Sequence, residues 1–387
     1  MDGSLLDQQA AAVGFLVAFL LAVLLTPVVS QAAWRAGVVD TPSDERRLHL
    51  RPTPLLGGLA IFAAIAIPAA ALGNDHGFWG IIAGAALMAM LGALDDIHPL
   101  HPAVKLCGML AIASIPAFLG ITIDHVTLPF LGVFDLGWWQ YPVTIIWIVA
   151  IANIVNFIDG MDGLAAGFCG IAALTFAVLA ASLGREDAAA ICAIVAGATL
   201  GFLRYNFHPA TIFMGDAGSL PLGFLLASMS ITGVMKTAAA LALVFPLIVL
   251  LVPILDTSFV ILKRLKYGQS VTAADRNHLH HRMLRVGYSQ RQAALVLYGW
   301  CLVLAAFALA VRFLHYKDPE GAVDVGQTLA LSAFALVALA ASAFVVYELE
   351  ILKYRHLRML GIARNADAED DVPLVTERRR RREGAIS

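Results

Sequence analysis

The sequence contains little charge: Asp, Glu, Lys and Arg make up only 14% of its 387 residues, whereas hydrophobic residues make up 60%. Soluble domains contain about 25% charged residues. The composition therefore excludes an ordinary water-soluble enzyme and indicates that the lipid bilayer is the main solvent of the protein. The net charge of −2 says little about partners, because the distribution of charge matters more than its sum. No nucleic-acid partner is expected.

Cysteine is also scarce, and nucleotide cradles are missing. The four cysteines lie in apolar stretches without a close pair or a metal-ligand spacing, so we expect small buried hydrophobic residues at Cys107, Cys169, Cys192 and Cys301. No GxxxxGK[ST] and no GxGxxG motif is present, which excludes the usual sites of ATP hydrolysis and hydride transfer. The first apolar stretch has no basic residues before it and no A-x-A cleavage site, which favours a retained helix over a signal peptide.

Long apolar segments are what the sequence has in abundance. A transmembrane helix needs about 20 mostly apolar residues, and eleven segments qualify: 10–33, 55–73, 77–94, 103–120, 140–157, 164–183, 187–205, 217–235, 237–262, 292–313 and 327–350. The fold class predicted is an all-α polytopic membrane protein. One membrane domain would cover 1–362, and an Arg-rich tail over 363–387 would be disordered.

The segment 121–139 differs from its neighbours. It mixes β-branched and aromatic residues with Gly and Pro, which predicts a small hairpin at the membrane surface. Trp138 and Trp139 would then lie among the lipid headgroups, as interfacial tryptophans do.

The positive charge is distributed unequally between the two predicted sides. With eleven spans, 22 of the 26 Lys and Arg residues share one side, in the loops 34–54, 95–105, 153–163, 203–216 and 263–291 and after 350. The other side keeps Arg185, Lys236, Arg312 and Lys317. Since short cytoplasmic loops carry the positive excess, we expect these loops in the cytoplasm and the N-terminus outside.

Adjacent carboxylates end the third apolar segment, in GALDDIHPLHPAVK. Asp95 and Asp96 lie at the predicted interface, where they repel each other unless a cation or a proton offsets them. They are either solvated charges at a helix end or a pair that binds a metal or acts in base chemistry. Lys105 is placed to hold an anion near them; as an isolated Lys at the interface it would mean nothing.

The loop NIVNFIDGMDGLAAG carries polar residues at a spacing of three: Asn153, Asn156, Asp159 and Asp162. Neighbours at this spacing share a helix face, but a regular helix rotates about 60° per step of three, so all four cannot converge. Gly160 and Gly163 allow a break that would turn the later carboxylates toward a common cavity. Amide and carboxylate oxygens are the ligands that Mg²⁺ prefers.

Glycine also surrounds the next polar motif. In FMGDAGSLPLG, Asp216 lies between Gly215 and Gly218 at the start of a predicted helix. It either holds a cation while backbone N–H groups face a phosphate or is a simple N-cap. Earlier in the chain, the pair Gly57-Gly58 ends a charged connector and would let the backbone approach a ligand closely.

A histidine cluster fills the last long cytoplasmic loop, with His278, His280 and His281 beside Arg276 and Arg282. A zinc site, a phosphate clamp and a solvated helix face are the alternatives. The neighbouring Arg residues suit bidentate phosphate recognition, whereas catalytic zinc needs three N or S ligands from separate turns. Asp256, in PILDT, is an ionisable group inside a span and therefore a functional candidate.

Together these loops supply hard-cation ligands, paired carboxylates and basic groups for phosphates. This set indicates metal-assisted phosphoryl chemistry at the membrane surface, where one phosphoanhydride is exchanged for another without an external energy source. A transporter is the competing class. It would place its ionisable groups near the midplane, often in two repeats, whereas here they gather at one interface.

The motifs DTPSDERRLHLRPTPLLGG, ALDDIHPLHPAVK, NIVNFIDGMDGLAAG, FMGDAGSL, PILDT and HLHHR resemble, in this order, those of the polyprenyl-phosphate N-acetylhexosamine-1-phosphate transferases. The resemblance implies a bacterial plasma-membrane enzyme in which undecaprenyl phosphate attacks the β-phosphate of a UDP-N-acetylhexosamine and UMP leaves. It implies Mg²⁺ as the cofactor, with Mn²⁺ as an alternative. A homodimer is compatible with it.

The resemblance also implies residue roles. Asp216 and Asn156 would be Mg²⁺ ligands, Asp95 and Asp96 would activate or position the lipid phosphate, and Lys105 would hold the pyrophosphate. Asp159 and Asp162, with Asn153 beside them, would bind the nucleotide end or support the metal. His278, His280, His281 and Arg282 would contact the sugar phosphate.

The histidine motif bears on the sugar. Its run is broken as His278-Leu279-His280-His281-Arg282, which is similar to the branch that uses UDP-N-acetylglucosamine. The muramoyl-pentapeptide branch carries three consecutive histidines instead. UDP-N-acetylglucosamine is therefore the expected donor, with another UDP-N-acetylhexosamine or UDP-N-acetylmuramoyl-pentapeptide as alternatives.

Overall fold

Helices account for most of the computed structural model, which describes residues 3–41, 52–71, 76–128, 132–235, 244–266, 282–284, 287–314 and 323–348. The chain divides into two units, Met1–Ser342 and Ala343–Ser387. All that follows concerns the first unit, which contains every described residue of the candidate site. His278, His280 and His281 lie outside the described residues, as does the predicted tail over 363–387.

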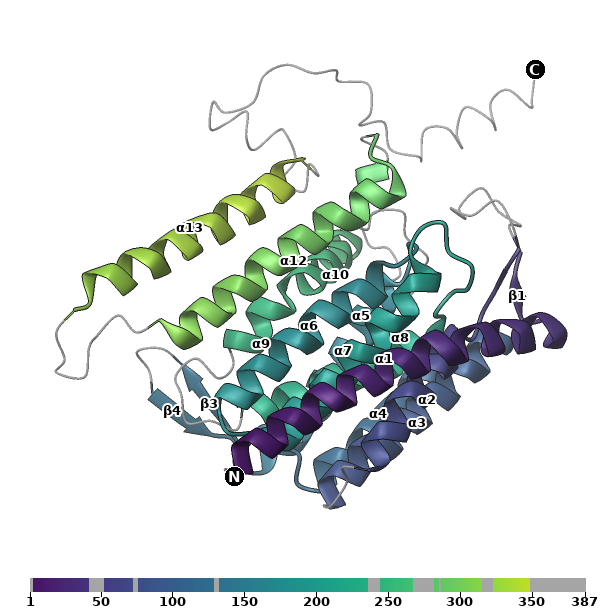
Figure 1. Ribbon diagram of the computed structural model, residues 1–387, viewed down its shortest axis with the longest axis horizontal. Coiled ribbons are helices and arrows are strands. Elements are labelled where there is room, and N and C mark those ends of the chain that lie inside the picture. Colours follow the sequence, from purple (N-terminus) through teal and green to yellow (C-terminus); the bar gives the residue numbers. More distant parts are fainter. Residues whose placement is uncertain are drawn as a thin grey trace. The chain divides into compact units, whose positions relative to one another are not determined.

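The helices follow the predicted apolar segments in order. Their bounds are α1 Gly3–Ala36, α2 Gly57–Ala70, α3 His76–Ile97, α4 Pro102–Phe118, α5 Gln140–Ile158, α6 Leu164–Ser182, α7 Glu186–Asn206, α8 Asp216–Ser230, α9 Val244–Val249, α10 Leu251–Lys266, α12 Gln290–Phe313 and α13 Val325–Glu348 (Figure 1). A π-helical turn, Ile231–Met235, continues α8. Every predicted segment thus contains helix.

Seven of the described helices are long and apolar enough to cross a membrane, namely α1, α3, α5, α6, α7, α12 and α13. Two further apolar helices, α2 and α4, are shorter. The protein is therefore a multi-pass helical membrane protein. The predicted count of eleven spans is higher than these seven, because α2, α4, α8 and α10 have 14, 17, 15 and 16 residues.

The core of this unit is built around α8. Every residue from Ala217 to Ser230 is buried, and α8 packs against α3 and α5 and also contacts α2, α6 and α7. A helix that is hydrophobic on all sides is buried on all sides. Gly223 of α8 allows a close approach to α5, since a Cβ there would lie 2.6 Å from Cα of Ala152.

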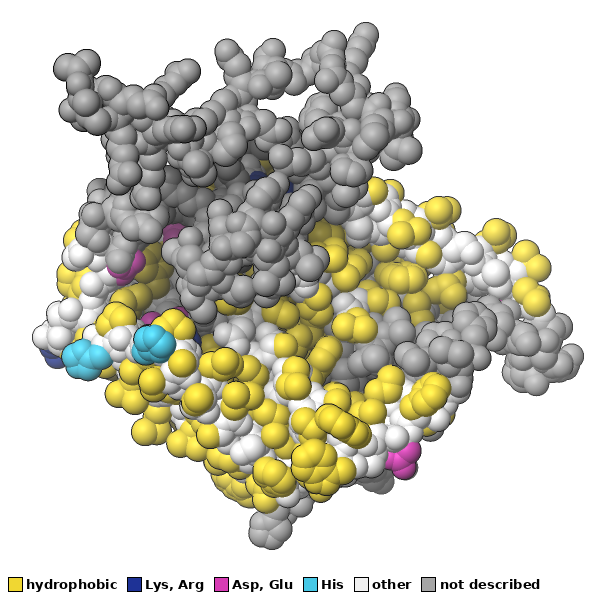
Figure 2. All heavy atoms as spheres, turned by 180° about the vertical axis from the view of Figure 1, so that it is seen from behind, with side chains coloured by type: hydrophobic (Ala, Val, Ile, Leu, Met, Phe, Trp, Pro, Cys, Tyr) yellow, Lys and Arg dark blue, Asp and Glu magenta, His cyan; other side chains and the backbone are white. Residues whose placement is uncertain are grey.

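The peripheral helices expose apolar side chains instead. In α1, Leu24 is 66% and Val28 is 62% exposed, and hydrophobic side chains cover much of the described surface in Figure 2. In a multi-pass membrane protein such faces contact lipid acyl chains. The low charge of the sequence is explained by these faces.

Two small antiparallel sheets lie at opposite ends of α1 (Figure 1). Near the end of α1, β1 (Val39–Asp40) pairs with β2 (Thr53–Pro54). Near its beginning, β3 (His125–Leu128) pairs with β4 (Gly132–Asp135), which confirms a hairpin within 121–139. A 3-10 turn, Gly137–Trp139, follows. Trp138 and Trp139 are 74% and 66% exposed, as interfacial anchors require.

Candidate active site

Helix ends bring the predicted acidic motifs together. Asp95 and Asp96 lie in the last turn of α3, Lys105 in the first turn of α4, Asn156 near the end of α5, and Asp216 is the first residue of α8. Because α3 and α5 both pack on α8, side chains that are distant in sequence meet around the start of α8.

Asp96 caps α8 across 120 residues of sequence. Its Oδ1 accepts the backbone N–H of Asp216 at 2.9 Å and its Oδ2 accepts that of Ala217 at 3.0 Å. A carboxylate at this position satisfies N–H groups that have no partner within the helix and interacts favourably with the helix dipole. Gly215 has φ +67°, and a Cβ there would lie 2.4 Å from Oδ2 of Asp96. Glycine is thus required at 215 for this cap.

Lys105 lies between two carboxylates. Its Nζ is 2.9 Å from Oδ2 of Asp95 and also contacts Oδ2 of Asp216. The other oxygen of Asp95, Oδ1, accepts the backbone N–H of Leu100 at 2.7 Å. The Lys105 side chain is only 18% exposed, so its ammonium group neutralises the carboxylates in a largely desolvated place.

Asn156 completes this cluster on the α5 side. Its Nδ2 donates to Oδ1 of Asp216 at 2.6 Å and to Oγ of Ser219 at 2.9 Å. Asn153, one turn earlier, donates instead to the carbonyl of Val149 at 2.8 Å. The structure therefore brings Asn156 to Asp216, whereas the recorded bonds of Asn153 lie elsewhere.

Asp159 ends α5 close to the same cluster. Burial raises the pKa of the Asp159 carboxyl well above its usual range, and the negative charges of Asp216 and Asp96 raise this pKa further. Such a group needs a proton or a cation nearby at neutral pH. A bound divalent cation would supply that charge.

Asp162 is held by the loop between α7 and α8. Its Oδ2 lies 2.7 Å from Nδ1 of His208 and accepts the backbone N–H of Ala210 at 3.0 Å. The next residue, Gly163, has φ +76° and donates its N–H to Oδ1 of Asn206 at 3.1 Å. The predicted break at the glycines is therefore real, but it turns Asp162 toward the His208 loop.

Tyr298 of α12 reaches the same turn. Its hydroxyl donates to the carbonyl of Gly163 at 2.6 Å. Gly167 makes room for this contact, because a Cβ there would lie 2.2 Å from Cζ of the Tyr298 ring. Sequence reasoning missed Tyr298, which lies inside an apolar span, and His208 and Asn206. Their signal was the presence of two polar side chains, Asn206 and His208, just before Pro209 in the connection between two apolar segments.

The Gly57-Gly58 pair does allow a close backbone approach, but the described partner is protein. The two N–H groups donate to the carbonyls of Phe213 and Met214, both at 2.9 Å. A Cβ on Gly58 would lie 2.0 Å from the backbone nitrogen of Gly218. The pair thus positions the FMGDAG segment, and through it Asp216.

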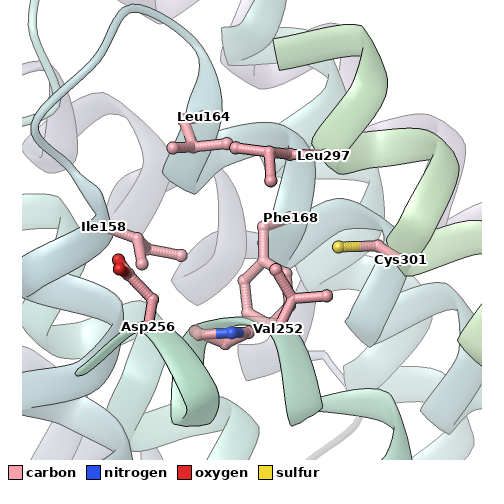
Figure 3. A pocket seen from close by; sticks show the side chains of 8 residues that line it. Ile158, Leu164, Phe168, Val252, Asp256, Leu297 and Cys301 are labelled. Carbon is pink, nitrogen blue, oxygen red and sulfur yellow. The ribbon is translucent and has the colours of Figure 1, made fainter. Parts of the chain in front are cut away.

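Asp256 lies beside this site in an apolar pocket (Figure 3). It is 3% exposed and comes from α10. Its carboxylate lies near Ile158, the residue before Asp159, as Figure 3 shows. The pocket is lined by Ile158, Leu164, Phe168, Val252, Pro253, Asp256, Leu297 and Cys301.

The donor set around Asp216 fits Mg²⁺. Among the described residues, no three His, Cys, Asp or Glu side chains form a metal-binding group by themselves. Mg²⁺, however, is usually bound by one or two carboxylates together with waters and substrate phosphates. Asp216 and the nearby Asp159 would supply carboxylate oxygens of this kind. Asn156 faces Asp216 with Nδ2, so its amide would have to turn for its oxygen to reach the ion. Arg282, which was predicted to contact the sugar phosphate, lies among the described residues in a helical turn at 282–284.

Comparison with known proteins identifies the family. Residues 78–234 match the model of glycosyl transferase family 4. A probable undecaprenyl-phosphate N-acetylglucosaminyl 1-phosphate transferase of Bacillus subtilis is 41% identical over 77% of this chain and 84% of its own length. A decaprenyl-phosphate N-acetylglucosaminephosphotransferase of Mycolicibacterium smegmatis is 34% identical over 85% of this chain and 86% of its own.

A more distant relative belongs to another branch. The phospho-N-acetylmuramoyl-pentapeptide-transferase of Desulforudis audaxviator is 32% identical over 78% of this chain and 96% of its own length. The residues that meet around the start of α8 lie within the matched range 78–234. The similarity to the relatives covers most of the chain. The protein therefore belongs to glycosyl transferase family 4, as a membrane enzyme that transfers a sugar 1-phosphate to a polyprenyl phosphate.

Proposed function

We propose that the protein transfers N-acetylglucosamine 1-phosphate from UDP-N-acetylglucosamine to undecaprenyl phosphate and releases UMP, which starts a lipid-linked cell-envelope glycan. The observation that carries this proposal is the cluster of Asp95, Lys105, Asn156 and Asp216 around the N-terminus of α8. The ammonium group of Lys105 suits a diphosphate, and the carboxylate and amide oxygens suit a hard cation. The first N–H groups of α8 are not open to a phosphate, because both bond to Asp96. The names of the relatives that are 41% and 34% identical support N-acetylglucosamine as the sugar.

The reaction exchanges one phosphoanhydride for another. An oxygen of the lipid phosphate forms a bond to the β-phosphorus of the nucleotide sugar, and the bond from that phosphorus to the bridging oxygen breaks. The electron pair leaves with UMP. Because the second pKa of a phosphate monoester is about 6, the attacking oxygen is already largely ionised at neutral pH and no strong base is needed.

The charged residues would then act by positioning and neutralisation. Lys105 would exchange its contact with Asp216 for a contact with the diphosphate, and would keep its contact with Asp95. Asp216 and Asn156 would hold Mg²⁺, or Mn²⁺ as the alternative. When bound, the metal neutralises phosphate charge and aligns the attacking and leaving oxygens. Positioning and charge neutralisation supply most of the catalysis in phosphoryl transfer.

The two adjacent aspartates would have different duties. Both oxygens of Asp96 accept backbone N–H groups of α8, so its carboxylate fixes the helix that carries Asp216. Asp95 contacts Lys105 directly, so it is better placed to act on the reactants. We therefore assign Asp95 the role closer to the lipid phosphate and Asp96 the positioning role. His278, His280, His281 and Arg282 would contact the sugar phosphate.

For the membrane, we propose eleven spans with the N-terminus outside and the site in the cytoplasm. The Lys and Arg distribution favours this orientation. The β3–β4 hairpin lies near the beginning of α1 (Figure 1), so in this orientation the hairpin and the N-terminus would share the outer side.

The test is an assay of UMP release. Purified protein would be incubated with undecaprenyl phosphate, Mg²⁺ and a panel of UDP-sugars, and UDP-N-acetylglucosamine is expected to be the productive donor. Release with UDP-N-acetylmuramoyl-pentapeptide alone would overturn the assignment of the sugar. Decaprenyl phosphate in a parallel reaction tests the assignment of the lipid.

Variants test the cluster itself. Asp216→Asn should abolish UMP release while the protein remains folded, because a neutral amide lacks the negative charge with which the carboxylate holds a metal ion. Asp187→Asn is the matched control: Asp187 is an exposed residue in the first turn of α7, so parent activity is expected. Activity of Asp216→Asn equal to that of the control would remove Asp216 from the metal site.

A further inference from the structure

We propose that His208 is a positioning residue for the nucleotide end of the substrate, and that it acts by fixing the carboxylate of Asp162. The inference rests on the proposed function, and it takes for Asp162 the first of the two roles that the family resemblance implies, binding of the nucleotide end rather than support of the metal. It starts from the short contact of 2.7 Å between Nδ1 of His208 and Oδ2 of Asp162.

The hydrogen bonds of Asp162 are one-sided. Oδ2 receives both the His208 ring and the N–H of Ala210, which lies at 3.0 Å. No recorded bond within the described part of the chain falls on Oδ1. A carboxylate held through one oxygen has a fixed plane, so its second oxygen points in one direction and is available to a donor on the substrate. The Asp162 side chain is 11% exposed, so its surroundings are largely dry.

His208 is itself held in place. Its backbone carbonyl accepts a hydrogen bond of 2.9 Å from Nε of Arg291, in the first turn of α12. The ring nitrogen that faces Asp162 donates, because an ionised carboxylate only accepts. The His208 side chain is 33% exposed. His208 thus provides a second connection between α12 and the glycine-rich turn after α5, beside the bond from Tyr298 to the Gly163 carbonyl.

The position of this pair separates it from the phosphate cluster. Asn156 contacts Asp216, whereas Asp162 lies beyond the end of α5 and contacts the loop before α8. Loss of the His208 contact should therefore weaken binding of the nucleotide sugar and leave the lipid phosphate unaffected. A residue that only stabilises the fold would not separate the two substrates.

The experiment measures KM for each substrate with purified parent protein, His208→Ala and His208→Asn. In His208→Ala, KM for UDP-N-acetylglucosamine should rise about tenfold, which corresponds to about 1.4 kcal/mol, while KM for undecaprenyl phosphate changes less than about twofold. The amide nitrogen of Asn replaces Nδ1 as a donor, so His208→Asn should bring KM back to within about threefold of the parent.

A matched control lies in the same loop. Thr211 donates its hydroxyl to the carbonyl of Tyr205 at 3.0 Å and has no recorded contact with Asp162. Thr211→Val removes one loop hydrogen bond and should leave both KM values at the parent level. The amount of folded protein and its thermal midpoint are measured for each variant. If His208→Ala misfolds, the KM values of His208→Asn test the role of His208 instead.

The outcomes are distinct. An equal loss for both substrates, or an unchanged KM for the nucleotide sugar in His208→Ala, overturns the role of His208. In that case an active parent protein leaves the proposed function standing. A parent that releases no UMP from any UDP-sugar refutes the proposed function, and this inference falls with it.

Discussion

The contact between α3 and α8 predicts a large effect from one added methyl group. Gly92 of α3 faces the first residue of α8, and a Cβ at position 92 would lie 2.2 Å from the carbonyl oxygen of Asp216 and 2.3 Å from its carbonyl carbon. Non-bonded carbon atoms pack at about 3.5 Å or more. In Gly92→Ala the start of α8 must therefore move away from α3 by about 1 Å.

This displacement acts directly on the site. The N–H groups of Asp216 and Ala217 bond to Asp96 at 2.9 and 3.0 Å. A shift of about 1 Å would lengthen these N···O distances beyond the usual hydrogen-bond range. Misplacement of a reacting group by about 1 Å costs on the order of 100-fold in rate. Overpacking in a core costs about 1–3 kcal/mol of stability. Gly92→Ala should therefore fold with a lowered thermal midpoint and lose about 100-fold in UMP release.

Gly299→Ala is the control for this substitution. Gly299 also lies in a helix interior, in α12, but a Cβ there would meet nothing within 4 Å. Both variants gain the same helix propensity, so their difference isolates the clash at Asp216. Activity is measured as UMP release, and stability as the thermal midpoint in detergent. If Gly92→Ala retains the activity of Gly299→Ala, the close packing of α3 on α8 does not set the position of Asp216.

Three further predictions concern the turn after α5 and the metal. Tyr298→Phe should lower UMP release several-fold at nearly unchanged stability, because it removes only the bond to the Gly163 carbonyl; full activity would make that bond irrelevant. In EDTA-treated protein at neutral pH, Asp159→Asn should have a higher thermal midpoint than the parent. This difference in thermal midpoint should disappear on acidification. The raised pKa of Asp159 means that its ionised form opposes folding above the folded-state pKa, and that this penalty disappears as the carboxyl becomes protonated; an advantage independent of pH would contradict this. EDTA should stop UMP release and Mg²⁺ should restore it, with Mn²⁺ as a second test; activity in EDTA would exclude the metal.

The sequence was sufficient to predict the helices and most of the residues that the structure brings together around the start of α8. Apolar length alone located each helix, and polar residues in apolar surroundings identified Asp95, Asp96, Asn156 and Asp216. Those side chains are recognisable because an ionisable group at a membrane interface is costly and persists for a reason.

Pairwise geometry was not predictable in the same way. Asp96 reads as a partner of Asp95, yet its hydrogen bonds go to α8, 120 residues later. Asn153 and Asn156 occupy equivalent places in the pattern, but only Asn156 contacts Asp216, because helix rotation separates them. Tyr298 has no polar pattern around it. Its role depends on the space left by Gly167, which only the packing of α12 on α6 reveals.

The bonds from Asp96 to α8 also have a consequence for biosynthesis. When α3 enters the membrane, the N–H groups that will bond to Asp96 have not yet been made, and Lys105 has only Asp95 as a carboxylate partner from these motifs. Asp96 obtains its recorded partners only after residues 216 and 217 have been synthesised. Until then its carboxyl group needs water or a proton to satisfy it at the bilayer surface. The hydrogen bonds that join α3 to the start of α8 can therefore form only when α8 inserts, after the helices between them have been synthesised.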